Sequence, residues 1–580
     1  MRKPQNRSAP AIDPTTVEII RNALHDIAEE MQTLVMQSAY SPLWQEGGDL
    51  SCILLSPDVE IVGRSERAIP IHIATQMSAT AAAIEQLGGY DALNPGDVLF
   101  HNDPYAGNNH LNDFLTVQPV FVDGELVGFA SNRGHWLDVG GSSPSSYATD
   151  TGELIQEGIC VPPTKLYRAG ELNEALYDTV LANVRNPEMR EVDFKAQLAG
   201  LRRGHTRLRE RAEEYGVSTL TASMNRILNG EERRMRDRIS ELPDGEYAAE
   251  DYIDGDGVED ELTRIAVTIT VDGDALHADF AGTEPQLFGG VNCPLGVTKT
   301  ATYYACKVTL DPGPPGSSGI YRPVSVSAPE GSLVNPTPPA PVANGNHETA
   351  SRVYDVVVKA IGEIDPAIAF GAGAGSSNGF SFSHVATGRQ GRHRTISGLG
   401  GCACRDGVDA IRSSVGNTAI QSFERTEEDY PFVRTEAFEI VPDSGGAGAH
   451  RGGNSMRRTI AFSEDVRVVL TAERTKVAPF GVRGGQDGST ARWIHITPDG
   501  ERIEKRSKFD EILPGGSKLE ATAAGAGGYG SPLDRPPEAV REDVADEYVS
   551  IEAARDEYGV AIDTETGEVD MRETARLRDD

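Results

Sequence analysis

A polar loop at residues 101–114, HNDPYAGNNHLNDF, contains side-chain types that could bind a metal ion. It contains two His, two Asp and four Asn around one Pro and one Gly. Imidazole nitrogens and carboxylate oxygens form a mixed ligand set that suits Zn²⁺, Mn²⁺ or Fe²⁺ rather than a thiolate site. Because Asn, Asp, Gly and Pro are also the residues that turns use, the loop alone is equally consistent with a turn between two strands.

A predicted β-hairpin follows this loop. Residues 114–136, FLTVQPVFVDGELVGFASNRGHW, hold two apolar runs joined by Asp123-Gly124, the preferred sequence of a two-residue hairpin turn. We therefore expect Val122 to pair with Glu125, which fixes the register of the whole hairpin.

The hairpin returns a second His to the loop. In the expected register His135 lies opposite Asn112, two residues from His110 and on the same face. Asp113 then points to the other face, so joining it to the two His requires a curl or bulge, which Pro119 in the first strand would allow. A hydrogen-bonded pair of structural His is the alternative to a metal site.

Helices and strands around the hairpin must position these side chains. A capping box at Thr15 and Glu18 precedes apolar residues spaced by three and four up to Leu34, which predicts a long amphipathic helix. Residues 49–63 predict two short strands, the first starting at Asp49, and residues 183–242 predict long charged helices.

The rest of the chain alternates between strand-like and helical patterns. Strands are expected from about 246, with a hairpin signal at Asp272-Gly273, and again over 433–497. Residues 297–310 predict a helix, whereas the Pro-rich stretch 312–342 predicts no regular structure. The tail after 565 is expected to be frayed.

These patterns predict an α+β chain, a multi-unit mixed fold with long N-terminal and mid-chain helices and several antiparallel β regions. A length of 580 residues exceeds what one hydrophobic core supports. We expect the following units: an N-terminal tail (1–14), a metal-site α/β region (15–240), an α+β middle region (241–432), a β-rich C-terminal region (433–565) and an acidic tail (566–580).

Composition restricts the partners and the compartment. Asp and Glu number 88 against 54 Lys and Arg, a formal charge of −34, so nucleic acid is not expected as a partner. With Lys scarce, this charge indicates adaptation to a salty, halophilic cytoplasm; an ordinary acidic protein is the alternative. No apolar run could span a membrane, and the six Cys lack metal or disulfide spacing, so we expect a cytoplasmic protein.

Two Gly clusters resemble nucleotide loops only in part. Residues 371–377 (GAGAGSS) and 525–532 (GAGGYGSP) do not fit the pattern GxxxxGK[ST]. The second matches GxGxxG by letters, but Pro residues follow where that motif requires a helix, so we interpret it as a loop.

Several long motifs in one order resemble the hydantoinase B family. They include HNDPYAGNNHLND, RGHWLDVGG, QEGICVPPTKL, NCPLGVTKTATYYACKVTLDP, PDSGGAGAHRGGNSMRR, GAGGYGSPLDRPPEAVREDV and the stretch from YRPVSVSAPEG through NGNHETASRVYDVV. The resemblance runs from about residue 12 to 565. This family includes B subunits of ATP-dependent hydantoinases, the matching half of 5-oxoprolinase and the related large subunit of acetone carboxylase.

The resemblance implies a set of metal ligands. In such proteins an Asp of an early strand, a His and an Asp three residues apart, and a later His hold the metal; here these are Asp49, His110, Asp113 and His135. The chain departs from the family pattern at Gly107-Asn108-Asn109 and at Trp136; these changes leave the ligands intact and bear on the identity of the substrate. Asp103 and Asp138 are candidate catalytic residues, and His72 is a further candidate for contact with the metal ligands or substrate.

The resemblance also implies a function. ATP is held by the A subunit, which phosphorylates the substrate, and the B subunit completes the reaction at its metal. We therefore expect a hydrolase subunit, part of a hetero-oligomer with a hydantoinase A-type subunit, that acts on a cyclic amide such as a hydantoin or 5-oxoproline. The alternatives are the large subunit of an ATP-dependent ketone carboxylase and a non-catalytic scaffold.

Overall fold

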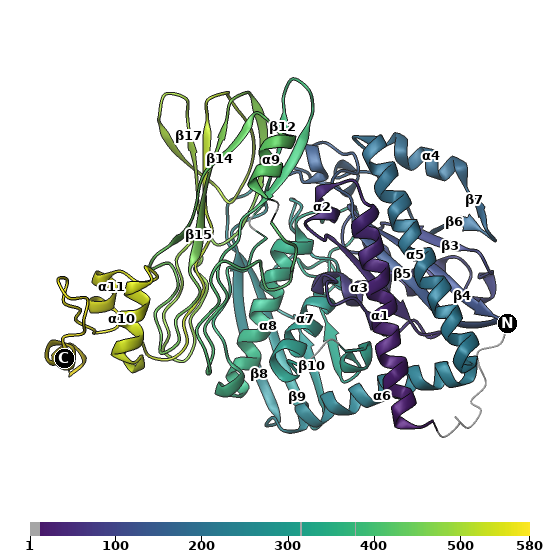
Figure 1. Cartoon of the computed structure of the whole chain (residues 1–580), viewed down its shortest axis with the longest axis horizontal. Helices are drawn as coiled ribbons and strands as arrows, with labels where there is room; N and C mark the ends of the chain where they lie inside the picture. The colour runs from purple at the N-terminus through teal and green to yellow at the C-terminus, as the bar shows by residue number, and fades with distance from the viewer. Residues whose placement is uncertain (1–11, 314–315, 378, 421, 580) are drawn as a thin grey trace.

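The computed structural model describes residues 12–313, 316–377, 379–420 and 422–579, and within these ranges its strands form four sheets (Figure 1). Helices lie between and beside the sheets, and neighbouring strands are antiparallel except for one parallel pair among the described residues. The predicted α+β class with several antiparallel β regions is confirmed. Residues 1–11 of the predicted N-terminal tail lie outside the described ranges.

The first sheet carries the His- and Asn-rich loop. Its strand order is β2-β1-β5-β4-β3-β6-β7. Helices α1 (Pro14–Ser38) and α5 (Pro187–Tyr215) pack on one face of this sheet, and α3 (Pro70–Gln86) packs on the other. Successive side chains of a strand point to opposite faces, so Leu54 of β1 lies in the core with α1 and α5, whereas Ile53 lies in the core with α3. The strands are β1 (Leu50–Leu55), β2 (Ile61–Arg64), β3 (Val98–His101), β4 (Asp113–Val122), β5 (Glu125–His135), β6 (Thr164–Arg168) and β7 (Glu171–Leu172).

The second sheet lies against helices α6, α7 and α8. Its order is β11-β10-β9-β8, and β10 and β11 are the parallel pair. Strand β11 lies in the Pro-rich stretch 312–342, so the prediction of no regular structure there is wrong; pairing with β10 overrides the local composition. The elements are α6 (Val217–Ser240), β8 (Gly245–Ile253), β9 (Thr263–Asp272), β10 (Ala275–Asp279), α7 (Leu295–Leu310), β11 (Val324–Ser327) and α8 (Ala350–Ile364).

The third and fourth sheets share one hydrophobic core and form a sandwich. Their orders are β13-β12-β16-β19 and β14-β15-β20-β17-β18. Because β12 pairs with β16, which lies beyond residue 433, the third sheet contains strands from both sides of the expected boundary at 432–433. The strands are β12 (Gly379–His384), β13 (Gln390–Arg394), β14 (Val433–Val441), β15 (Ser455–Phe462), β16 (Val466–Thr471), β17 (Arg492–Ile496), β18 (Arg502–Lys505), β19 (Lys508–Leu513) and β20 (Lys518–Thr522).

Shorter helices complete the described chain. Helix α12 occupies the tail that was expected to be frayed, and that expectation is wrong because Arg578 donates to the carbonyl of Arg535 and Thr574 is buried. The helices are α2 (Pro42–Gln45), α4 (Glu174–Ala182), α9 (Phe423–Asp429), α10 (Pro537–Ala545), α11 (Ile551–Asp556) and α12 (Met571–Asp579). Single turns lie at Tyr90–Ala92, Pro104–Ala106, Pro144–Ser146, Leu154–Gln156, Ser318–Tyr321, Gly345–Thr349, Pro366–Ile368 and Pro532–Asp534.

Several predictions of individual helices, strands and turns agree with the structure. The two strands at 50–64, the two long helices at 187–240 and the hairpin at 272–273 are confirmed. The capping box at Thr15 and Glu18 is wrong, because Asp13 caps α1 through its carboxylate and the backbone N–H of Thr16 (3.2 Å).

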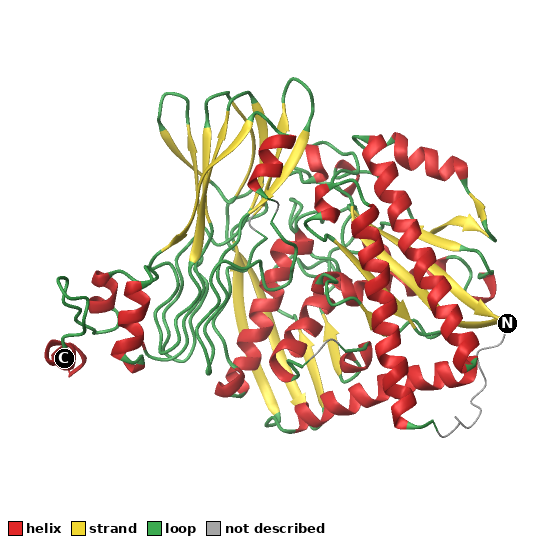
Figure 2. Ribbon diagram, in the orientation of Figure 1, coloured by secondary structure: helices red, strands yellow, loops and turns green. Residues whose placement is uncertain are grey.

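Both Gly clusters belong to loop segments that run side by side next to the sandwich (Figure 2). Gly371 donates to the carbonyl of Gly401 (2.9 Å), Gly401 to that of Gly527 (2.9 Å) and Gly527 to that of Ala372 (2.8 Å). A Cβ on Gly527 would overlap the carbonyl oxygen of Phe480. The clusters therefore let backbones pack closely, and the interpretation of 525–532 as a loop is confirmed.

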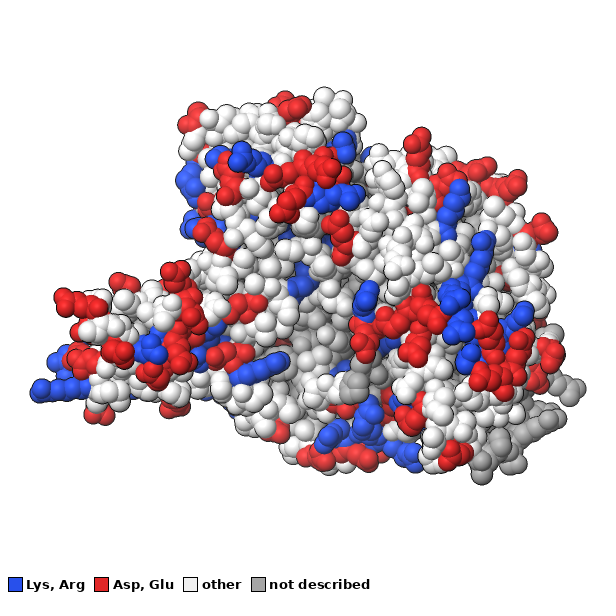
Figure 3. Space-filling model, viewed as in Figure 1, with Lys and Arg blue, Asp and Glu red and all other residues white. Residues whose placement is uncertain are grey.

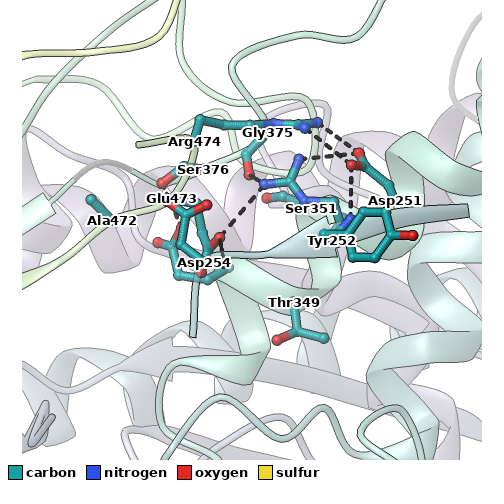
Figure 4. Close-up of polar contacts among 12 residues, drawn as sticks. Asp251, Tyr252, Asp254, Thr349, Ser351, Gly375, Ser376, Ala472, Glu473 and Arg474 are labelled. Atoms are coloured by element: carbon teal, nitrogen blue, oxygen red, sulfur yellow. Dashed lines mark hydrogen bonds and ion pairs between the residues drawn. The ribbon is translucent and has the colours of Figure 1, made fainter. Parts of the chain in front are cut away.

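A buried ionic network joins the sandwich to the second sheet (Figure 4). Nη2 of Arg474, which follows β16, lies 2.9 Å from Asp251 on β8 and 2.8 Å from Asp355 on α8. The adjacent Glu473 accepts from the backbone N–H of Asp254 (2.8 Å). Removing one member of a buried network leaves another charge unpaired, so these contacts fix the relative position of the two parts.

The face of the molecule in Figure 3 carries Asp and Glu side chains interspersed with Lys and Arg. Within the described residues, the helices include none with the length and apolar character needed to cross a membrane. The halophilic and cytoplasmic assignments stay predictions.

The close packing of the Gly-rich segments gives a direct test. Gly527→Ala should lower the unfolding midpoint and cost at least about 2 kcal/mol, because the new methyl group displaces backbone that cannot yield. Gly230→Ala is the matched control: it lies inside α6 with open space around the new methyl group, and should be neutral or stabilising by about 0.5–1 kcal/mol. Equal midpoints for the two variants in thermal unfolding would contradict the account.

Candidate metal centre

The β4–β5 hairpin brings Asp113 and His135 face to face. Val122 pairs with Glu125 as predicted, but the register shifts by one residue between Val120 and Phe121. Asp113, rather than Asn112, therefore pairs with His135, and the predicted pairing is wrong by one residue. Since opposite residues of an antiparallel pair share a face, this bulge puts the carboxylate beside the imidazole.

Three ligand-type atoms converge at the end of this hairpin. His110 Nε2 lies 3.1 Å from Asp113 Oδ1 and 3.2 Å from His135 Nδ1, and His135 Nδ1 lies 2.9 Å from Asp113 Oδ1. Ligands about 2.1 Å from one ion lie about 3 Å apart, so this triangle fits a divalent metal. His110, Asp113 and His135, which we name the metal triad, could therefore hold an ion.

The atoms around the triad fit a bound cation. His110 Nδ1 lies 3.1 Å from the carbonyl of Ala343, which assigns the proton to Nδ1 and leaves Nε2 free to bind. Among the described residues, His135 Nε2 is buried without a hydrogen-bond partner, and Asp113 Oδ2 accepts no hydrogen bond but lies close to His72. His72, on α3, places Nε2 3.2 Å from Asp113 Oδ2 and Nδ1 3.2 Å from Ser51 Oγ. The candidate His72 thus contacts the triad.

Electrostatics favour an ionised Asp113 carboxylate and a neutral His135 imidazole. Burial raises the pKa of Asp113, but the charge of His110 and the hydrogen bonds from the two triad histidines outweigh it and hold that pKa well below its ordinary value. Burial lowers the pKa of His135 to about 4, although Asp49 and Asp113 oppose the shift. An ionised carboxylate and a neutral imidazole are the forms in which these side chains bind a metal ion.

Asp49 lies beside the metal triad, but its carboxylate is not among the convergent ligand atoms of His110, Asp113 and His135. Its backbone carbonyl accepts from the N–H of His135 (3.1 Å), and its carboxylate pairs with Arg394. Burial raises the pKa of Asp49, but the charges of Arg394 and His135 lower it below the ordinary value. Its role as a fourth ligand stays a prediction.

Asp103 and Asp138 lie outside the cavity next to the triad. Asp103 accepts from the backbone N–H of Tyr105 (2.9 Å). Asp138 accepts from the backbone N–H of Ser145 (2.8 Å) and from Gln390 Nε2 (3.2 Å), and is paired with Arg185 (3.1 Å). These contacts are structural, and a catalytic role for either carboxylate stays a prediction.

Sequence reasoning missed side chains that come from distant parts of the chain. Tyr147 has its ring 5.8 Å from that of His110 and 5.2 Å from that of His347. His347 lies in a single π-helical turn before α8, and its Nε2 is buried without a hydrogen-bond partner among the described residues. The adjacent His and Glu at a helix start in NGNHETASR were a usable signal for it. Three arginines at the same cavity had no local signal: Arg392, Arg394 and Arg412.

Comparisons with known proteins identify the family. The family model described as hydantoinase B/oxoprolinase matches residues 13–532. A protein of a Pseudomonas strain, provisionally named as the B component of a D-/L-hydantoinase, is 33% identical over 587 residues, covering 98% of each chain.

Two solved structures share the fold. The ATP-dependent caprolactamase of Pseudomonas jessenii superposes with a TM-score of 0.90 at 28% identity, over 98% of this chain and 100% of that chain. Nucleotide-free acetone carboxylase has a TM-score of 0.88 at 18% identity, over 98% of this chain and 82% of that chain, which shows a shared fold alone. The resemblance found in the sequence is confirmed: this chain belongs to the hydantoinase B/oxoprolinase family.

Proposed function

We propose that this chain is the metal-binding subunit of an ATP-dependent cyclic-amide hydrolase. The observation that carries the proposal is the metal triad, in which two imidazoles and one carboxylate meet within 3.2 Å in a buried site. The relatives named as a hydantoinase component and a caprolactamase support a cyclic amide as the substrate and ATP as the energy source.

The division of labour follows from amide chemistry. An amide carbon is a poor electrophile, and transfer of the γ-phosphoryl group of ATP to the amide oxygen activates that carbon. Water then adds to the carbon, and the protonated ring nitrogen leaves with the electron pair of the C–N bond. A second water releases phosphate from the resulting acyl phosphate. Overall, one ATP and two waters are consumed for one ring-opened product, an amino acid from a lactam or an N-carbamoyl amino acid from a hydantoin, with one ADP and one phosphate.

The residues of this chain would prepare that second stage. His110, Asp113 and His135 would hold a Zn²⁺, Mn²⁺ or Fe²⁺ ion, which lowers the pKa of water and polarises an oxygen near it. The carbonyl of Ala343 fixes the ring of His110, and His72 approaches the free oxygen of Asp113. Burial of all three triad side chains keeps bulk water away from an activated intermediate.

The ATP-dependent ketone carboxylase is the second candidate. The shared fold of acetone carboxylase favours it, and the same site would then join an activated enol to carbon dioxide. The higher identity to the caprolactamase favours the hydrolase. A non-catalytic scaffold has no use for a buried ligand set, which disfavours that third possibility.

The metal triad predicts about one transition-metal ion per chain. His110→Ala should remove the metal while the chain stays folded, because two remaining ligands of the triad bind an ion much more weakly. Elemental analysis of the purified protein, with circular dichroism to verify folding, measures both.

His205→Ala is the matched control, since this His lies half-buried on α5 away from the triad and should leave the metal content unchanged. Wild-type metal content in His110→Ala would remove His110 from the site.

ATP binding gives the second test of the division of labour. The chain alone should show no calorimetric binding at about 1 mM ATP, because neither Gly cluster opens a helix or supplies the Lys of a phosphate loop. The complex with its A-type partner should form ADP with hydantoin, 5-oxoproline or caprolactam and not with acetone. Micromolar ATP binding by this chain alone would contradict the division, and ADP formation with acetone alone would favour the carboxylase.

A further inference from the structure

Three arginine side chains converge on the cavity beside the metal triad. The cavity has a volume of about 50 Å³, and Arg392, Arg394 and Arg412 line it together with Asp49 and His135. Since a water-sized group needs about 10–15 Å³ of such space, the cavity holds about four of them. It therefore has room for the four oxygens of one tetrahedral anion next to the triad.

Among the described residues, only one of these guanidinium groups has a carboxylate partner. Arg394 pairs with Asp49. Arg412 donates to the carbonyl and to the hydroxyl of Ser377, which are both neutral. Arg392 is only 8% exposed, so its Nε and Nη1 are shielded from solvent, and neither atom has a hydrogen-bond partner within the described part of the chain. The cavity thus contains more donors and positive charge than its walls can pair.

This excess of positive charge costs free energy in the absence of a ligand. Burial lowers the pKa of Arg412 to about 9, and the nearby charges of Arg394 and Arg392 contribute to that shift. Buried cations are retained where a partner or a ligand compensates them.

The fold holds the arginines in place before any ligand arrives. Arg392 and Arg394 are alternate residues of β13, so their side chains leave the same face of the strand. The guanidinium of Arg392 lies over the ring of Tyr147, 3.9 Å from its centre. Asp138 joins the two sides, because its carboxylate binds both Gln390 at the start of β13 and the loop before Tyr147. The sandwich thereby brings a cationic wall against the metal site of the first sheet.

We propose that Arg392, Arg394 and Arg412 form an anion site that binds the phosphoryl group of the activated substrate and, after ring opening, inorganic phosphate. The inference rests on the proposed function and assigns three residues of this chain to the phosphoryl group that the proposed reaction requires. Planar guanidinium forks match the oxygens of a phosphoryl group, and Arg392 offers two unused donors. Holding the phosphoryl group here would place the carbon that carries the phosphorylated oxygen beside the metal triad.

Calorimetric titration of the full chain with inorganic phosphate at low ionic strength tests the site. Arg392→Gln and Arg412→Gln should each weaken phosphate binding about tenfold, as expected for loss of one charge-assisted contact. Arg392→Lys keeps the charge without the fork, so it should bind phosphate with an affinity between those of wild type and Arg392→Gln. Phosphate affinities within twofold of wild type in both Gln variants would overturn the proposal.

Arg389→Gln is the matched control. Arg389 is exposed in the turn between β12 and β13, with its guanidinium 5.4 Å from the ring centre of Tyr430, and its loss should leave phosphate affinity unchanged. Should a Gln variant fail to fold, the Lys variant and inhibition of turnover by phosphate provide the same comparison. Competition shows which kind of anion the site prefers: sulfate, which is tetrahedral like phosphate, should displace phosphate, whereas the carboxylate acetate should not. Displacement by acetate at equal concentration would assign the arginines to a substrate carboxylate and overturn the proposal.

The two levels of inference fail differently. Turnover of a cyclic amide by the complex, together with arginine variants of unchanged phosphate affinity, would contradict the anion site and leave the hydrolase intact. Arginine-dependent phosphate binding with no turnover of any cyclic amide would support the anion site and contradict the proposed reaction.

Discussion

The carboxylate of Asp113 is completely buried, and the arrangement of the first sheet depends on compensating its charge. Three histidines from three elements meet it: His72 from α3, His110 from the loop before β4 and His135 from the end of β5. An isolated carboxylate in such surroundings would cost several kcal/mol, so a cation or a set of hydrogen bonds must accompany it. A metal ion held by His110 Nε2, Asp113 Oδ1 and His135 Nδ1, the three convergent atoms of the triad, would meet that requirement.

The rest of the chain supplies what the first sheet lacks. Glycine-rich segments pack backbone against backbone beside the sandwich, and the ionic network around Arg474 ties the sandwich to the second sheet. With that position fixed, β13 presents Arg392 and Arg394 to the cavity that the triad borders. Metal ligands from the N-terminal part and cationic side chains from the C-terminal part thus form one site.

The sequence predicted the local parts of this site and missed the distant ones. The two-residue turn at Asp123-Gly124 gave the correct hairpin because turn chemistry acts over four residues. The sequence also indicated an irregularity at Pro119, and the bulge lies at the next residues, Val120 and Phe121. The resulting pairing of Asp113 with His135 could not be read from the local pattern. Tyr147, His347 and the arginines reach the triad only through tertiary structure, and their roles needed the fold.

Anomalous scattering from crystals of the protein as purified tests the central claim most directly, because it locates an ion without assuming its ligands. The account predicts one strong peak about 2.0–2.2 Å from His110 Nε2, Asp113 Oδ1 and a ring nitrogen of His135, with the element identified from its absorption edge. The account would be contradicted if well-ordered crystals showed no anomalous peak there and the side chains were joined only by hydrogen bonds. These side chains are Asp113, His72, His110 and His135.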